Sequence, residues 1–161
     1  MDNQDKSFVR WGVVALALFG ATSAVAQAQQ KTPYWASIEE PEARMRTGPS
    51  TEFPVTWVYK RRNLPVKVVA VHSVWRRVQD PNGEQGWLHV RLLSPKRTAI
   101  VVGKEVGALR DAPEPNAHIS WRVEPGVVGV IDECDKGYCR FETEGRYGYI
   151  ESARIWGDDT P

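Results

Sequence analysis

An internal repeat constrains the fold of this chain more than any other feature of its sequence. Met45-Arg46-Thr47-Gly48-Pro49 recurs 64 positions later as Leu109-Arg110-Asp111-Ala112-Pro113, and Trp57 meets Trp121 at the same offset. A further matched pair, reached after two single-residue deletions, is Gly86-Trp87-Leu88 and Gly148-Tyr149-Ile150. Matched segments that keep their order along a chain are typical of a duplicated structural unit. The sequence therefore predicts two copies of one small domain.

Within each copy the residue pattern is that of short β-strands. Residues 66–71 and 127–131 are runs rich in β-branched side chains, as strands require. Asp80-Pro81-Asn82-Gly83 predicts a hairpin turn, because Pro suits its second position and Gly a positive φ. No apolar period of 3.6 residues persists beyond two turns. We predict an all-β protein of two tandem small β-barrels, each with five or six strands and one 3₁₀ turn near residues 90–93.

Each copy is small for an independent domain. We place the copies at residues 34–97 and 98–157, and a domain of about 60 residues buries only about 60% of its surface. We expect packing of the two copies against each other, together with a disulfide in the second copy, to supply the missing stability. Cys134 and Cys139 flank the turn-like Asp135-Lys136-Gly137-Tyr138, which places them across a tight hairpin. A zinc site or a redox-active pair favours C-x-x-C spacing, so we predict a structural disulfide and no metal.

The first 26 residues are interpreted as a signal peptide. A weakly basic start is followed by the apolar residues 12–21, and Ala24-Val25-Ala26 is a small-x-small cleavage site. A second such site allows cleavage after Ala28. The alternative is an uncleaved membrane anchor, which needs about 20 apolar residues, whereas Thr22 interrupts this segment after roughly ten. We expect cleavage, no membrane span in the mature chain, and a protein that is periplasmic or secreted.

The signature segments of the first copy match a known pattern. The string Ala43-Arg44-Met45-Arg46-Thr47-Gly48-Pro49-Ser50 resembles the opening of bacterial SH3 (SH3b) domains. Trp75, the Gly86-Trp87-Leu88 segment and the closing Leu92-Leu93 resemble the ending of that family. The resemblance covers residues 34–156, and the chain is similar to exported, two-repeat SH3-like proteins of alphaproteobacteria.

This resemblance implies an SH3-like barrel with a recognition role, commonly toward cell-wall peptides or polymers. Such domains are often attached to hydrolases, and because no hydrolase domain is seen here, we expect the recognition part alone. The second copy departs from the pattern, with Asp111-Ala112 in place of Thr-Gly and Tyr149 in place of the Trp.

The signature residues are expected to have mainly structural roles. They are Met45, Arg46, Gly48, Pro49, Trp75, Gly86, Trp87, Leu109, Pro113, Gly148 and Tyr149. Gly48 or Gly86 is expected to supply a backbone conformation or a close approach that a side chain would block. The side chains expected in the core of the first barrel are Met45, Val68, Trp75, Val78 and Trp87.

A basic strip in the first copy is the candidate ligand-binding surface. Trp57 and Tyr59 stand just before Lys60-Arg61-Arg62, and guanidinium groups beside aromatic rings are suited to carboxylates and phosphates. The alternative is a solvated loop that carries charge for solubility. Trp57 and its repeat partner Trp121 have two open interpretations, as cover for the interface between the copies or as an aromatic shelf for ligand.

The two halves carry opposite charge. Residues 33–98 contain eleven Lys and Arg against six Asp and Glu, a net charge of +5. Residues 99–161 contain seven against twelve, a net charge of −5. Such halves attract each other and fix how the copies dock, or they engage two different partners. Docking of the copies on each other is the more economical hypothesis.

Catalysis finds little support in the sequence. His72, His89 and His118 are scattered, and there is no G-x-S-x-G motif or glycine-rich phosphate loop. We predict no enzymatic activity and no cofactor. Export and a total charge near +1 count against nucleic acid. The leading hypothesis is a periplasmic recognition module for cell-wall peptide, peptidoglycan or an envelope protein. The alternative is an interaction or regulatory subunit that localises a larger envelope enzyme.

Overall fold

The structure is a computed structural model that describes residues 31–158. The predicted signal peptide and both of its cleavage sites lie outside these residues. Within the described part of the chain, no helix has the length and apolar character needed to cross a membrane.

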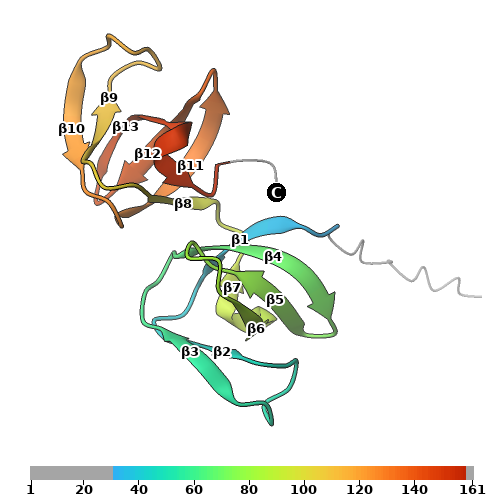
Figure 1. The fold of residues 1–161 in the computed structure, drawn as a ribbon. Coiled ribbons are helices and arrows are strands. Elements are labelled where there is room, and N and C mark those ends of the chain that lie inside the picture. The colour runs from blue at the N-terminus through green and yellow to red at the C-terminus, as the bar shows by residue number, and fades with distance from the viewer. Residues whose placement is uncertain (1–30, 159–161) are drawn as a thin grey trace, which may run out of the picture.

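The described chain forms two antiparallel seven-stranded sheets, one from each copy (Figure 1). The strands of the first sheet are β1 (Tyr34–Ile38), β2 (Ala43–Arg46), β3 (Val55–Tyr59), β4 (Pro65–His72), β5 (Trp75–Gln79), β6 (Gln85–His89) and β7 (Leu93–Ser94). Those of the second are β8 (Thr98–Val101), β9 (Gly107–Arg110), β10 (Ile119–Val123), β11 (Val128–Asp135), β12 (Tyr138–Thr143), β13 (Arg146–Glu151) and β14 (Ile155–Trp156).

Both sheets have the same strand order. It is β3-β2-β6-β5-β4-β1-β7 in the first copy and β10-β9-β13-β12-β11-β8-β14 in the second. The predicted all-β architecture, with two copies of one small barrel, is confirmed. Each copy has seven strands rather than five or six, because a two-residue strand follows the 3₁₀ turn and pairs with the first strand. The 3₁₀ turns are Val90–Leu92 and Ser152–Arg154. Strand β7 directly follows the first turn and pairs with β1, and β14 directly follows the second and pairs with β8.

Each copy encloses its own apolar core. In the first, Met45, Val68 and Val78 are at most 2% exposed, as predicted. The hairpin turn after Asp80 is also confirmed, since Gly83 donates its N–H to the Asp80 carbonyl at 3.0 Å and has φ +87°. A similar core in the second copy includes Leu109, Phe141 and Ile150.

Two predicted core residues of the first copy are not fully buried. Trp75 and Trp87 are both only half-buried. Successive side chains of a strand point to opposite faces, and Gly86 and Leu88 face the core, so Trp87 has to face outward. Its ring packs edge-on against His72 at 6.4 Å, and that of Trp75 packs against His89 at 5.4 Å.

A glycine permits the close approach of two strands in each copy. A Cβ built on Gly86 would lie 2.5 Å from Met45 Cγ and 2.9 Å from the Arg46 carbonyl oxygen. One on Gly148 would meet Leu109 Cβ at 2.8 Å and the Arg110 carbonyl oxygen at 2.9 Å. The expected close approach at Gly86 is therefore present, and it recurs at Gly148.

Gly48 shows why the second copy departs from the signature. A Cβ on Gly48 would meet the Phe53 ring at 2.6 Å. At the matching positions, 64 residues later, the second copy has Ala112 and Ala117. Removal of the phenyl ring makes room for the methyl group, so the two changes compensate each other.

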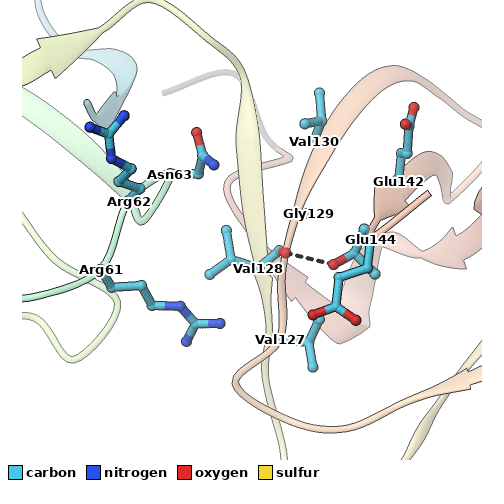
Figure 2. Close-up of a pocket in the computed structure, with 10 residues that line it drawn as sticks. Arg61, Arg62, Asn63, Val127, Val128, Gly129, Val130, Glu142 and Glu144 are labelled. Carbon is cyan, nitrogen blue, oxygen red and sulfur yellow. Dashed lines mark hydrogen bonds between the residues drawn. The ribbon is translucent and has the colours of Figure 1, made fainter. Parts of the chain in front are cut away.

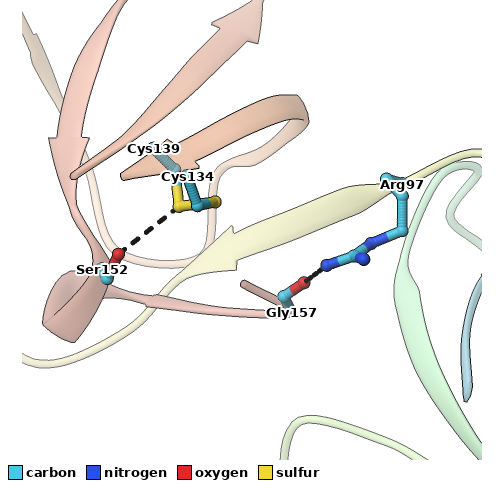
Figure 3. Close-up of a disulfide and its surroundings, with 5 residues drawn as sticks. All are labelled: Arg97, Cys134, Cys139, Ser152 and Gly157. Carbon is cyan, nitrogen blue, oxygen red and sulfur yellow. Dashed lines mark hydrogen bonds between the residues drawn. A yellow bond between two sulfur atoms is a disulfide. The ribbon is translucent and has the colours of Figure 1, made fainter. Parts of the chain in front are cut away.

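The predicted disulfide is present at the end of a hairpin. Cys134 and Cys139 are directly opposed in the β11–β12 pair and are bonded, with Lys136 and Gly137 both at positive φ in the turn between them (Figure 3). Cys139 is fully buried in the second core, and its Sγ lies 3.4 Å from Ser152 Oγ.

The two copies contact each other through aromatic and aliphatic side chains. Trp35 of β1 and Trp156 of β14 pack edge to face, with ring centroids 4.6 Å apart. Ile100 and Val128 of the second copy pack against the core of the first. In the connection between the copies, Arg97 donates a hydrogen bond to the Gly157 carbonyl at 2.7 Å (Figure 3).

The glycine contacts predict an order of stability losses. Gly86→Ala and Gly148→Ala should each lower the free energy of unfolding by about 1–3 kcal/mol, because a backbone carbonyl stands in the way. Gly48→Ala should cost less, since the half-exposed Phe53 ring is able to move. Urea unfolding measures all three, with Gln85→Ala on β6 as the control. A loss at Gly48 equal to that at Gly86 would contradict this account.

Reduction of the disulfide should destabilise the second copy only modestly. Closing so short a loop is worth about 2 kcal/mol on the chain-entropy estimate. We expect dithiothreitol to lower the melting temperature and to change the fluorescence of the second copy before that of the first. Two reactive thiols in denatured, unreduced protein would contradict the pairing.

Candidate binding surfaces

The structure separates the members of the predicted basic strip. The prediction that Tyr59 lies on this surface is wrong, because its side chain is only 5% exposed and belongs to the first core. The Tyr59 hydroxyl donates to Asp80 Oδ2 at 3.2 Å, and Asp80 Oδ1 accepts from the N–H groups of Asn82 and Glu84. Burial, followed by the charge of Asp80, raises the pKa of Tyr59 above its ordinary value of 10.0.

Arg61 and Arg62 face the second copy. Arg61 Nη1 donates to the Gly126 carbonyl of that copy at 2.7 Å. Both arginines line a cleft of about 320 Å³ between the copies, and Glu142 and Glu144 line its other side (Figure 2). Of the basic strip, Arg61 therefore contacts the second copy directly, through a backbone carbonyl rather than through an acidic side chain. The role of the strip in binding a ligand stays a prediction.

Trp57 and Trp121 are not buried between the copies. They are 53% and 44% exposed, and the aromatic contact between the copies is made by Trp35 and Trp156 instead. The interpretation that these two residues cover the interface between the copies is therefore wrong for both. Each stands on the outermost strand of its sheet, β3 or β10, and remains available as an aromatic shelf.

The second copy carries a groove that includes Trp121. It has a volume of about 510 Å³ and crosses the neighbouring strands β10, β9, β13 and β12. Its lining residues are Arg110, Asp111, Ser120, Trp121, Arg140, Tyr147, Gly148 and Tyr149. Tyr147 is the most exposed aromatic side chain of the described residues, at 63%.

Arginines stack on the exposed aromatic rings of this groove. The guanidinium carbon of Arg140 lies 5.6 Å from the Tyr147 ring centroid, and that of Arg146 lies 4.6 Å from the Trp121 centroid. Arg140 also approaches Asp132 at 3.9 Å. The second copy is acidic as a whole, yet its groove is locally basic. Stacked guanidinium groups are suited to ligands that combine carboxylates with flat or apolar parts.

Arg110 has a structural role at the edge of the groove, and Arg46 has the same role in the first copy. Arg110 Nη1 donates to the Ala117 carbonyl at 2.9 Å. Arg46 Nη1 donates to the Phe53 carbonyl at 2.7 Å and to the Thr51 carbonyl at 2.9 Å. In each copy, therefore, the signature arginine holds the loop that follows its own strand.

Sequence reasoning missed Arg140 and Tyr147 as candidate ligand contacts. The available signal was alternation along β13, where Tyr147 and Tyr149 flank the core-facing Gly148 and so share the outer face. Arg140 is opposite Tyr149 in the β12–β13 register. At the equivalent positions the first copy has Arg77, Gln85 and Trp87, so the outer face of its sheet has one aromatic ring fewer.

No metal centre is assembled in the part of the chain that the structure describes. Within residues 31–158, no three His, Cys, Asp or Glu side chains lie close enough together to hold a metal ion.

Comparison with known proteins identifies the family of both copies. The family model for the bacterial SH3 domain matches residues 39–95 and, a second time, residues 103–157. The chain belongs to the bacterial SH3 domain family. The predicted resemblance is thus confirmed at the level of the family and of two SH3 repeats. The finer similarity to exported proteins of alphaproteobacteria stays a prediction.

Other comparisons give distant likenesses only. No curated protein sequence matches this chain. The solved structures of NlpC1 and NlpC2 from Trichomonas vaginalis are each 14% identical to it, with a TM-score of 0.36. The matches cover 81% and 79% of this chain but only 48% and 49% of the two structures. The chain thus spans about half the length of these proteins.

The buried Tyr59 predicts how stability changes at alkaline pH. Because the pKa of Tyr59 is raised in the folded state, its contribution to stability is fully present below pH 10, the ordinary pKa of tyrosine. That contribution is lost as pH rises above this value. Above pH 10, Tyr59 should therefore lower the free energy of unfolding by about 1.4 kcal/mol per pH unit. Tyr59→Phe should remove that part of the slope, while losing about 1–3 kcal/mol near pH 8.

Urea unfolding at pH 8, 10 and 11 measures both effects. Tyr147→Phe is the control, because the Tyr147 side chain is exposed. Equal alkaline slopes for wild type and Tyr59→Phe would contradict the assignment.

Proposed function

We propose that this chain is a non-catalytic recognition module that binds cell-wall peptide in the bacterial envelope through the groove of its second SH3 repeat. The observation that carries the proposal is the locally basic, aromatic groove around Tyr147, Arg140 and Trp121 within an otherwise acidic repeat. Membership of the bacterial SH3 family supports a role in recognition. An acidic wall peptide offers the carboxylates that stacked guanidinium groups bind.

A location outside the cytoplasm is part of this proposal. The bonded Cys134–Cys139 pair supports it, because disulfides persist in oxidising compartments. A periplasmic or secreted protein would meet the cell wall directly.

A second candidate function is an interaction subunit that localises a larger envelope enzyme. It is favoured by a group of exposed apolar side chains along the edge strand β3 and the loop before it. They are Phe53, Val55, Trp57 and Val58, each 40–53% exposed. An exposed sheet edge with apolar side chains is a surface on which proteins pair.

Retention on purified sacculi tests the leading proposal. Arg140→Ala and Tyr147→Ala should each weaken retention about tenfold or more, because each removes one member of a stacked charged pair. The matched controls are Arg77→Ala and Gln85→Ala, which are the same positions in the first repeat and should bind as wild type does.

Three results would decide against this groove. Normal retention of Arg140→Ala and Tyr147→Ala would show that the wall is bound elsewhere. Loss of retention in the controls alone would place the site in the first repeat. If sacculi retain nothing but a protein from envelope extract is retained, and Trp57→Ala releases it, the interaction subunit is the better account.

A further inference from the structure

The cleft between the repeats has walls of opposite charge. The first repeat contributes Arg61, Arg62 and Asn63, which follow β3. The second contributes Glu142 and Glu144 at the β12–β13 hairpin, together with residues 127–130 at the start of β11 (Figure 2). The space between the walls is about 320 Å³, near the lower end of the range for small-ligand sites.

The charged groups of the two walls are not joined to each other. Among the described residues, no ion pair connects Arg61 or Arg62 with Glu142 or Glu144. Arg61 is held by the Gly126 carbonyl, which leaves its charge at the edge of the cleft. Because these opposite charges are not paired with each other, both signs are available to a molecule that enters the cleft.

The backbone fixes both walls in uncommon conformations. Of the four non-glycine residues with positive φ in the described chain, two line this cleft, Asn63 at +60° and Glu144 at +50°. Asn63 donates its N–H to the Ile38 carbonyl at 2.7 Å, and Glu144 precedes Gly145, also at positive φ, in a two-residue turn. Glutamate is a costly choice at such a position, and residues of this kind gather at functional sites.

We propose that this cleft binds a short peptide of two or three residues with free amino and carboxyl ends. The carboxylate would pair with Arg62 and the outer part of Arg61, and the ammonium group with Glu142 and Glu144. A simple anion such as phosphate is disfavoured because the two glutamates repel it, and a simple cation is disfavoured by the arginines. This second site is separate from the groove of the second repeat, so its test is independent of the proposed function.

Four versions of one tripeptide test the proposal by calorimetric titration of the full chain at low salt. They are trialanine with both ends free, its C-terminal amide, its N-acetyl form, and the form with both ends capped. The free-ended peptide should bind with a Kd of about 1 mM. Each cap should weaken binding about tenfold, because it removes one charge-assisted pair.

Charge-removing variants assign each end of the peptide to a wall. Glu144→Gln should weaken binding of free trialanine about tenfold but leave the weak binding of N-acetyl-trialanine unchanged. Arg62→Gln should likewise weaken binding of free trialanine about tenfold, but it should leave the weak binding of the C-terminal amide unchanged. The matched controls are Glu151→Gln and Arg77→Gln, exposed charges that do not line the cleft.

Thermal unfolding of each variant without peptide shows whether it is folded. Equal affinity for all four peptides, or no saturable binding at about ten times the expected Kd, would overturn the proposal. So would binding that survives both Glu144→Gln and Arg62→Gln in folded protein. Arg140→Ala should bind trialanine as wild type does, which separates this site from the proposed wall-binding groove.

Discussion

The barrel of each repeat depends on the close approach of two strands at a glycine. Only one residue pair, Arg46 with Trp87, joins β2 to β6 in the first sheet, and Gly86 lets the two strands meet there. The same contact joins β9 to β13 at Gly148. A side chain at either glycine would push the outer hairpin away from the rest of the sheet. Because strands alternate, the glycine also turns its aromatic neighbour outward, so one constraint shapes both the core and the surface.

Duplication supplied the scaffold, and departures from the repeat supplied the distinct surfaces. Trp35 and Trp156 lack a matching Trp in the other copy, and this pair forms the aromatic contact between the repeats. Tyr147 stands where the first repeat has Gln85, and the groove of the second repeat is built around it. Identical copies would present identical faces. The differences allow one repeat to offer a basic, aromatic groove while the contact between the repeats creates a second site.

Errors of the sequence interpretation came from side chains whose direction depends on distant partners. The basic run beside Tyr59 predicts a surface position, but the side chain turns inward because Asp80, 21 residues later, offers a buried acceptor. The size and apolar character of Trp87 predict a core position, but the inward-facing positions of its strand are those of Gly86 and Leu88. The repeat correctly predicts that Trp57 and Trp121 occupy equivalent positions, but it does not predict whether another part of the chain covers them.

The duplication, the strands, the hairpin at Asp80 and the Cys134–Cys139 bond all follow from the amino-acid sequence alone. Each of these depends on residues close together in the chain, or on a pattern that two copies show twice. Tertiary structure decided that Arg61 and Arg62 face Glu142 and Glu144, and that Arg140 stacks on Tyr147. The approach of the two walls depends on how two barrels dock, which follows from the summed packing around Trp35, Val128 and Trp156 rather than from any local motif.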